Sequence, residues 1–139
     1  MTDVPARRSV RVAEVMVRHP KVLPASATVG AVRAALEDDH VHMVLLADGD
    51  VLRGTVVRAD LPSTAPPTER ALPRSRLAGR TVPPDADAER VREQLVQEGT
   101  RRLAVVDDGR LLGLLCLKRR QTGFCSDADV ADRRCEQPA

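Results

Sequence analysis

The sequence predicts an α/β protein built from two tandem units of the same order, β-α-β-β, each followed by the start of a further helix. Three features predict this fold class: an internal repeat, a tight-turn signal inside each copy, and a proline-rich stretch between the copies. Residues 41–49 align with residues 100–108, and Gly54 aligns with Gly113, at the same offset of 59 positions. Self-similarity in this order indicates two copies of one supersecondary unit.

Each copy is predicted to open with a short extended segment and then a helix. The extended segments are residues 21–23 and 80–82, and prolines follow both, which ends a strand because proline cannot donate a ladder hydrogen bond. The first helix has apolar side chains at spacings of three and four, at Val29, Val32 and Leu36. In the second copy Asp87 is placed to cap a helix. The inward positions predicted for that helix are Ala88, Val91, Leu95 and Val96.

Two strands around a tight turn complete each copy. The predicted strands cover residues 43–47 and 51–57 in the first copy and residues 102–106 and 110–117 in the second. Both pairs enclose an Asp-Gly step, and Asp-Gly between apolar runs is a strong hairpin signal. After the first hairpin, a further helix is predicted to begin near Arg58.

The repeat divides the chain into four segments. They are a first repeat with an N-terminal arm (1–61), a linker (62–75), a second repeat (76–120) and a C-terminal tail (121–139). Four prolines in the linker disfavour a helix or a central strand, so we expect an irregular wrap there. In the tail, Ser126 and Asp129 have the spacing of a capping box, which predicts a short helix. Phe124, the only aromatic residue of the chain, would fix that helix to the domain.

Composition and charge restrict the function classes. With one Phe and no Trp or Tyr, the chain lacks the aromatic platforms on which single-stranded nucleic acids stack, and its formal net charge is only +2. We therefore expect no specific nucleic-acid partner. No apolar run approaches the roughly 20 residues that span a bilayer, and the N-terminus lacks the apolar core of a signal peptide. We expect no membrane association.

The cysteines indicate a reducing compartment. Three cysteines without paired short spacings, in a chain without an export signal, predict reduced thiols in a cytoplasmic protein. The abundance of Arg, Ala, Val and Pro suggests a bacterial source. Cys116 lies on a predicted strand, where a small buried hydrophobe is the expected role. Cys125 and Cys135 lie in the tail, where we expect exposure; redox sensing by these two is the alternative to an inert role.

The sequence contains no arrangement of residues typical of catalysis. It has no Ser-His-Asp set, no paired carboxylates and no phosphate-cradling glycine-rich loop. His19, His40 and His42 lack the ligand spacing of a metal site. We therefore expect a protein that is not an enzyme and that holds neither a metal nor a cofactor.

The order of elements and several short motifs resemble the CBS repeat. Residues 12–16 with Pro20 are similar to that family's opening V-x-D-x-M-x-x-x-P stretch. Residues 102–107, followed by Gly113, are similar to its r-l-p-V-v-d … g-x-l-v-G core. The resemblance covers about residues 11–120. It implies two β-α-β-β-α repeats that pack through their sheets with pseudo-twofold symmetry and leave two clefts.

The same resemblance implies a function. Members of the family are regulatory modules that bind AMP, ADP, ATP or S-adenosylmethionine and commonly form homodimers. We expect a stand-alone sensor that binds such an adenosyl ligand and passes its occupancy to a protein partner, which the sequence does not identify.

The family's ligand motif is G-h-h-[ST]-x-x-D, whose hydroxyl reaches a phosphate and whose carboxylate binds the ribose diol. In the first copy the motif runs from Gly54 to Asp60, with Val57 at the hydroxyl position. In the second copy Cys116 and Arg119 replace the hydroxyl and the acid, and a guanidinium cannot accept a hydrogen bond. The resemblance therefore implies one nucleotide cleft, near Asp60. Its other predicted ligand-binding residues are Val57 and Arg58 of the motif, Val22 and Leu23 as apolar walls for the base, and Arg101 and Arg102 near the phosphates.

Other interpretations stay open. The substituted motif positions favour an interaction module that has lost ligand binding and serves as a dimerisation scaffold. Binding of nucleic acid would rest on the arginines alone, and its signature is a steep salt dependence of affinity. For single residues, the alternative for Asp60 is plain helix capping, and that for Arg101 and Arg102 is a solvated strand end.

Overall fold

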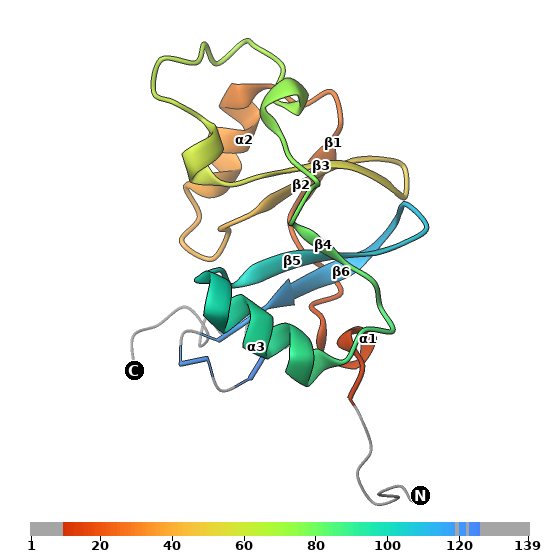
Figure 1. Cartoon of the computed structure of the whole chain (residues 1–139). Coiled ribbons are helices and arrows are strands. Elements are labelled where there is room, and N and C mark those ends of the chain that lie inside the picture. Colours follow the sequence, from red (N-terminus) through yellow and green to blue (C-terminus); the bar gives the residue numbers. More distant parts are fainter. Residues whose placement is uncertain (1–9, 119, 122, 126–139) are drawn as a thin grey trace, which may run out of the picture.

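The computed structural model of the protein describes residues 10–118, 120–121 and 123–125 (Figure 1). In chain order its elements are α1 (Val12–Val15), β1 (Val22–Pro24), α2 (Val29–Leu36), β2 (Val44–Asp48), β3 (Val51–Val56), the 3-10 turns η1 (Arg58–Asp60) and η2 (Leu72–Arg74), β4 (Thr81–Val82), α3 (Ala88–Glu98), β5 (Arg102–Asp107) and β6 (Arg110–Cys116). None of the described helices is long and apolar enough to span a membrane.

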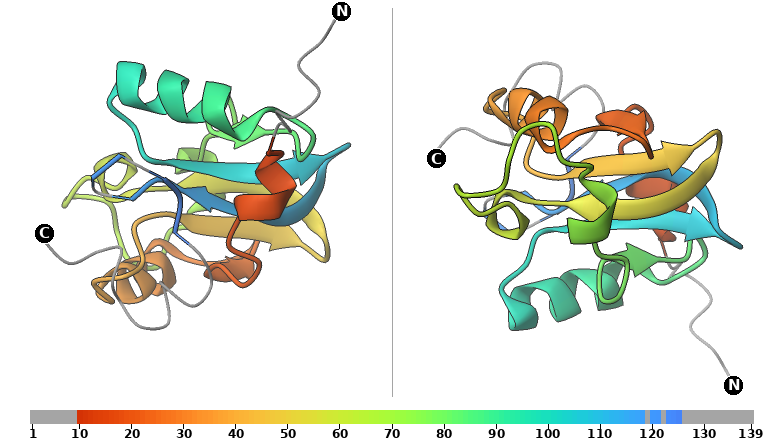
Figure 2. Two further views of the ribbon diagram at one scale, coloured as in Figure 1. Left: turned by 90° about the horizontal axis from the view of Figure 1, so that it is seen from below. Right: turned by 90° about the horizontal axis from the view of Figure 1, so that it is seen from above.

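The strands form one sheet whose order reflects the sequence repeat. The order is β1-β2-β3-β6-β5-β4, so each half contains one hairpin with a parallel strand on its outer side. The halves join where Val51 of β3 pairs with Arg110 of β6. Figure 2 shows α2 and α3 on opposite outer sides, with the strands between them. The predicted fold class, two α/β repeats related by pseudo-twofold symmetry, is confirmed.

Both hairpins form at the predicted turns. In the second hairpin, Asp108 (φ 53°) and Gly109 (φ 84°) both have positive φ, as a type I′ turn requires. In the first, Gly49 alone supplies a positive φ, of 65°. The loop of the first hairpin is Gly49-Asp50, with glycine at the first position as a type II′ turn requires, and that of the second is Asp108-Gly109. Both turn types match the right-handed twist of the strands.

Three apolar clusters hold the layers together. One joins α2 to the outer face of β2 and β3, and a second joins α3 to the outer face of β5 and β6. The third lies between the two hairpins and contains Met43, Leu45, Leu52 and Ala104. Successive residues of β2 serve different clusters, because Leu45 lies in the third and Leu46 in the first, and both are fully buried. Burying each such side chain stabilises the fold by about 1.5–3 kcal/mol.

The segment before each repeat packs on the other repeat. The Val12 amide donates to the carbonyl of Ala86, and Val12 is buried in the cluster under α3. In the linker, the Ala71 amide donates to the carbonyl of Ala27, and Ala71 is buried in the cluster under α2. Val12 and Ala71 are separated by the repeat offset of 59 positions. The N-terminal arm therefore packs on the second repeat in the same way as the linker packs on the first. The linker is the irregular wrap that the prolines predicted.

Two glycines allow these segments to cross the hairpins closely. A Cβ on Gly113 would lie 2.5 Å from the carbonyl oxygen of Val17, and one on Gly54 would overlap the side chain of Ser75. Backbone bridges mark both crossings, Val17 with Leu114 and Thr55 with Arg76. Any larger residue at either glycine would push the crossing segment away from the sheet.

The structure corrects three predictions. The helix expected after Val57 is only the 3-10 turn η1, because Pro62 has no amide hydrogen to continue it and holds Leu61 in an extended conformation. Val96 is 37% exposed, since the buried face of α3 runs through Ala88, Val91 and Leu95. Cys125, expected to be exposed, is fully buried. The predicted tail helix lies outside the described residues.

Candidate functional site

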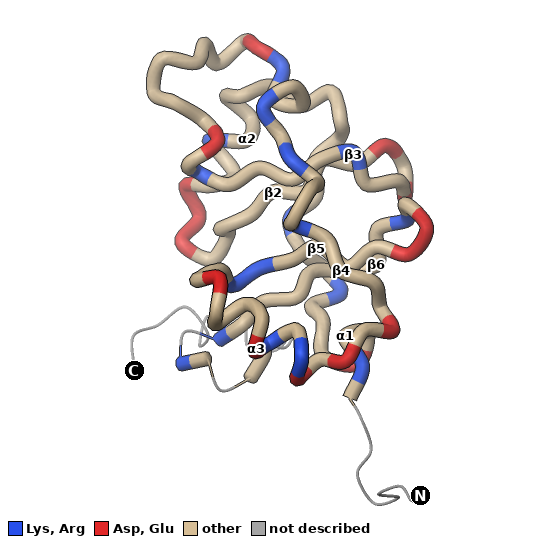
Figure 3. The backbone as a smooth tube through the Cα atoms, in the orientation of Figure 1, with Lys and Arg blue, Asp and Glu red and all other residues tan. Residues whose placement is uncertain are grey.

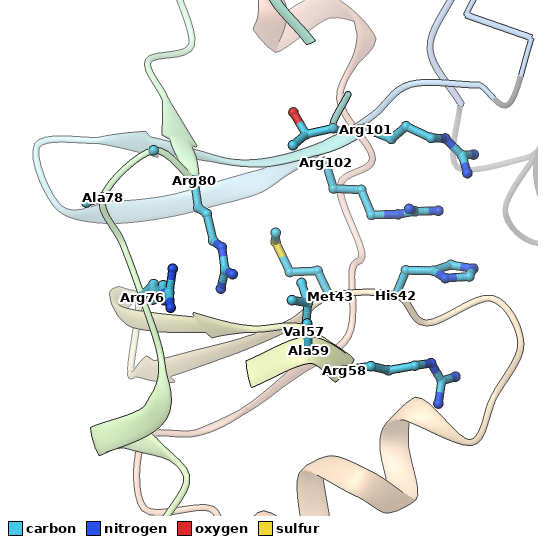
Figure 4. Close-up of a pocket in the computed structure, with 12 residues that line it drawn as sticks. His42, Met43, Val57, Arg58, Ala59, Arg76, Ala78, Arg80, Arg101 and Arg102 are labelled. Carbon is cyan, nitrogen blue, oxygen red and sulfur yellow. The ribbon is translucent and has the colours of Figure 1, made fainter. Parts of the chain in front are cut away.

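A cleft of about 490 Å³ opens between the two repeats. It is lined by the starts of β2 and β5, by η1 with the residue before it, and by the segment that precedes β4 (Figure 4). Five arginines line it: Arg58, Arg76, Arg80, Arg101 and Arg102. None of its lining residues is acidic. A concave wall of guanidinium groups concentrates anions, so the cleft is suited to a negatively charged ligand.

The arginines come from both repeats. Arg58 follows β3 of the first repeat, Arg102 is the first residue of β5 of the second, and Arg101 precedes it. Figure 3 shows positively charged positions at the start of β5 and along the segment before β4. Arg76 and Arg80 lie on the segment that crosses the first hairpin, which two hydrogen bonds between the backbones of Thr55 and Arg76 hold at 2.9 and 3.0 Å. Figure 4 shows the arginines of this segment on one side of Met43 and the other three on the opposite side.

Two of these guanidinium groups are anchored on backbone carbonyls. Arg58 donates to the carbonyl of Leu36 at the end of α2, and Arg101 donates through Nε to the carbonyl of Leu117, at 3.1 Å. Neutral carbonyls orient a guanidinium without cancelling its charge. The anchoring therefore keeps positive charge at the rim of the cleft.

Asp60 is the counter-ion of the cleft. Its side chain is 4% exposed, and its two carboxylate oxygens accept hydrogen bonds from Arg80 at 2.6 and 3.0 Å. The same carboxylate accepts from the Val57 amide at 2.9 Å and lies 3.8 Å from Arg76. Burial raises the pKa of Asp60, but the Arg80 hydrogen bond, the Val57 amide and the two positive charges outweigh it and lower this pKa below its ordinary value. Asp60 is thus ionised and already holds Arg80.

Four of the predicted site residues line the cleft together: Val57, Arg58, Arg101 and Arg102. Asp60 does not line the cleft itself but binds Arg80, which does. The predicted apolar walls are elsewhere. Leu23 packs with the cluster under α2, and Val22 is 40% exposed on β1, and neither lines the cleft.

Sequence reasoning missed Arg76, Arg80 and Met43 as lining residues. The repeat offset pairs Arg80 with Lys21, at the start of each extended segment, but nothing in the sequence shows that this segment crosses the first hairpin and faces η1.

The second copy of the motif is arranged differently. Cys116, at the hydroxyl position, is buried as predicted, and the chain returns over it, because the Cys125 amide donates to its carbonyl at 2.7 Å. Arg119, at the position of the acid, lies outside the described residues. In the described part of the chain, no group of three or more His, Cys, Asp or Glu side chains could hold a metal ion.

Residues 70–119, which contain the crossing segment and the second repeat, match the model of the CBS-domain family. These residues therefore form a CBS domain. Among curated proteins no match was found. The six-stranded arrangement around the cleft is that of a CBS-domain pair, and solved CBS structures match it over most of its length.

Three solved structures show how similar the fold of this chain is to known CBS folds. A CBS-domain protein from Pyrobaculum aerophilum, solved in complex with AMP, is 22% identical, with a TM-score of 0.66 over 81% of this chain and 89% of that one. A protein with CBS domains from Burkholderia ambifaria is 17% identical, with a TM-score of 0.63 over 94% and 98% of the two chains. The cytosolic domain of the Mg²⁺ channel MgtE, in complex with ATP, is 25% identical, with a TM-score of 0.60 over 74% of this chain and 44% of that one.

Proposed function

We propose that this CBS-domain pair is a regulatory sensor that binds an adenine nucleotide in the cleft beside Asp60. The observation that carries the proposal is the convergence of five arginines from both repeats on one cleft whose lining contains no acid. Its volume of about 490 Å³ lies within the range of small-molecule sites. The structures of two proteins of the same fold, in complex with AMP and with ATP, support this class of ligand.

The lining offers a partner for each part of such a ligand. The arginines would bind the phosphates through charge-assisted hydrogen bonds. Met43, Val57 and Ala59 would contact the apolar face of the base. Asp60 would accept from the ribose diol only after Arg80 turns from the carboxylate toward the phosphates, so the two residues would exchange partners on binding.

The proposed role is regulatory and not catalytic. Because the cleft takes residues from both repeats, a ligand that bridges them stabilises one relative arrangement of the repeats over others. A partner protein, or the second subunit of a homodimer, would respond to that arrangement.

A thermal-shift titration with AMP, ADP, ATP, NADH and S-adenosylmethionine tests the proposal. A ligand that binds only the native state stabilises it by about 2.7 kcal/mol at a hundred times Kd. Inorganic tripolyphosphate serves as the probe for charge alone. A shift with a nucleotide that exceeds the shift with tripolyphosphate supports nucleotide binding, whereas equal shifts would indicate an unselective anion site.

Arg76→Ala connects any shift to this cleft. The Arg76 side chain is 70% exposed, so its loss should leave the fold intact. Loss of one charge-assisted bond of about 1.5–3 kcal/mol weakens nucleotide affinity about tenfold or more. Arg90→Ala on the exposed side of α3 is the matched control, since it removes the same charge away from the cleft. Equal affinity in the two variants would contradict the assignment.

A ligand-free scaffold is the second candidate function. It is favoured by the Asp60 carboxylate, whose oxygens are already bound to Arg80, and by the second motif, which lacks both its hydroxyl and its acid. If no nucleotide shifts the melting temperature at millimolar concentration and light scattering shows a stable dimer, this candidate replaces the first.

A further inference from the structure

Cys116 and Cys125 face each other in the interior of the second repeat. Their sulfur atoms lie 3.2 Å apart, within hydrogen-bonding contact. Cys116 is 4% exposed and Cys125 is fully buried, and with Val17 they form a small apolar cluster. The two thiols therefore contact each other and are shielded from solvent.

The backbone brings the pair into strand register. After β6 the chain reverses, and Leu117 and Phe124 form an antiparallel bridge. The Lys118 amide donates to the carbonyl of Gly123 at 2.8 Å, and the Cys125 amide donates to that of Cys116 at 2.7 Å. Cys116 and Cys125 are thus directly opposite in an antiparallel pair. Such positions have Cα atoms about 4.5–5.5 Å apart, inside the range of about 4.4–6.8 Å that a disulfide requires.

We propose that Cys116 and Cys125 form a reversible disulfide that fixes the start of the C-terminal tail to β6. With a peroxide as oxidant, one thiolate attacks the O–O bond and becomes a sulfenic acid, releasing water from hydrogen peroxide. The second thiolate then attacks that sulfur and displaces the oxygen as a second water. Two thiols and one peroxide give one disulfide and two waters. A dithiol reductant reverses the step.

Access to the pair requires only local opening. The described segment 123–125 is held on β6 by a short antiparallel pairing at the edge of the fold, and such end segments open at low free energy without global unfolding. Oxidation would convert this opening segment into a covalently fixed one. It would also fix the chain over Cys116, the motif position of the second repeat. The nucleotide cleft beside Asp60 contains neither cysteine, so this inference does not depend on the proposed function.

Peptide mapping of the whole chain tests the proposal. The native protein is treated with hydrogen peroxide or diamide, the remaining thiols are alkylated, and the protein is unfolded and digested with trypsin. The three cysteines fall in three separate tryptic peptides, residues 111–118, 121–133 and 135–139. We expect a cross-link between the first two that dithiothreitol removes, and alkylation of Cys135 only.

Variants separate this pair from other oxidation products. Cys135→Ser should keep the cross-link, and Cys125→Ser should abolish it. The oxidised wild type should melt several degrees above the reduced protein, because a short loop has been closed. A cross-link to Cys135, a dimer joined by disulfides, or sulfinic acid without any cross-link would overturn the proposal.

Discussion

Replacing Asp60 by Asn keeps the shape of the side chain and removes the charge that holds Arg80. The carboxylate is 4% exposed, and both of its oxygens accept from Arg80, at 2.6 and 3.0 Å. Removing one partner from a buried ion pair costs about 3–5 kcal/mol, because the remaining charge has no compensation. The Arg80 side chain is 19% exposed, so water can solvate its charge and reduce the free-energy cost of losing the carboxylate. We expect Asp60→Asn to lower the free energy of unfolding by about 2–3 kcal/mol.

Urea unfolding followed by far-ultraviolet circular dichroism measures this loss, since the chain has no Trp or Tyr for fluorescence. A double-mutant cycle with Arg80→Gln should give a coupling energy of about 2 kcal/mol. Asp50→Asn is the matched control. Asp50 pairs with Arg110 at 3.3 Å, but both side chains are more than 60% exposed, so we expect a loss below about 1 kcal/mol. Equal losses in the two Asn variants, or a coupling energy near zero, would refute the reasoning.

The pH dependence of stability gives a second test of the same pair. The pKa of Asp60 in the folded protein is below its ordinary value of 3.8. The stability that this shift contributes is therefore fully present above pH 3.8 and is lost as the pH falls through the folded-state pKa. Asp60→Asn lacks this contribution, so the difference in unfolding free energy between wild type and variant should shrink on acidification. A difference that stays constant down to pH 3 would show that the ion pair does not carry it.

Three further substitutions test the fold by urea unfolding. Gly113→Ala places a Cβ 2.5 Å from the carbonyl of Val17 and should cost about 1–3 kcal/mol, whereas Gly123→Ala, with open space around it, should cost much less. Gln121 has a φ of 66°, a left-handed backbone conformation that glycine adopts more easily than glutamine. Gln121→Gly should therefore stabilise the protein by about 0.5 kcal/mol. A loss of stability would indicate an unrecognised contact of the glutamine side chain. Asp87 accepts from the amides of the first turn of α3, so Asp87→Ala should cost about 1 kcal/mol; no loss would show that the cap is dispensable.

The elements of this fold could be predicted from the sequence because they depend on local patterns. The hairpins follow from Asp-Gly steps between apolar runs, and α3 follows from Asp87 and the spacing of Val91 and Leu95. The glycines that the repeat aligns turned out to have a physical role, since Gly113 leaves room for the crossing segment. These signals lie within a few residues of the structure that they produce.

Contacts between the repeats could not be predicted in the same way. Val12 and Ala71 are apolar residues whose side chains fit the core of either copy, and the sequence does not show that each packs on the other repeat. The ion pair of Asp60 with Arg80 depends on that crossing, which brings together residues twenty positions apart. Cys125 was expected to be exposed because it lies in the C-terminal tail, yet the bridge between Leu117 and Phe124 places it against β6, where it is buried.

The asymmetry between the two copies of the site follows from substitutions at matched positions. At the repeat offset, Lys21 stands in place of Arg80, and Arg119 stands in place of Asp60. Two cations cannot form the ion pair that orders the first cleft, and Cys116 contacts the returning segment 123–125. We therefore propose that the cleft beside Asp60 binds an anionic ligand, whereas Cys116, at the matching motif position of the second copy, contacts the chain's own C-terminal segment.

This division predicts that nucleotide binding and disulfide formation are separable. Cys125→Ser should abolish the cross-link and leave nucleotide affinity unchanged, because Cys125 lies in the second half and does not line the cleft. Arg76→Ala should weaken nucleotide binding and leave the cross-link intact. Isothermal titration of the reduced and oxidised proteins measures the first property, and peptide mapping measures the second. If oxidation alone changed nucleotide affinity severalfold, the two copies would be coupled and the division of roles would be wrong.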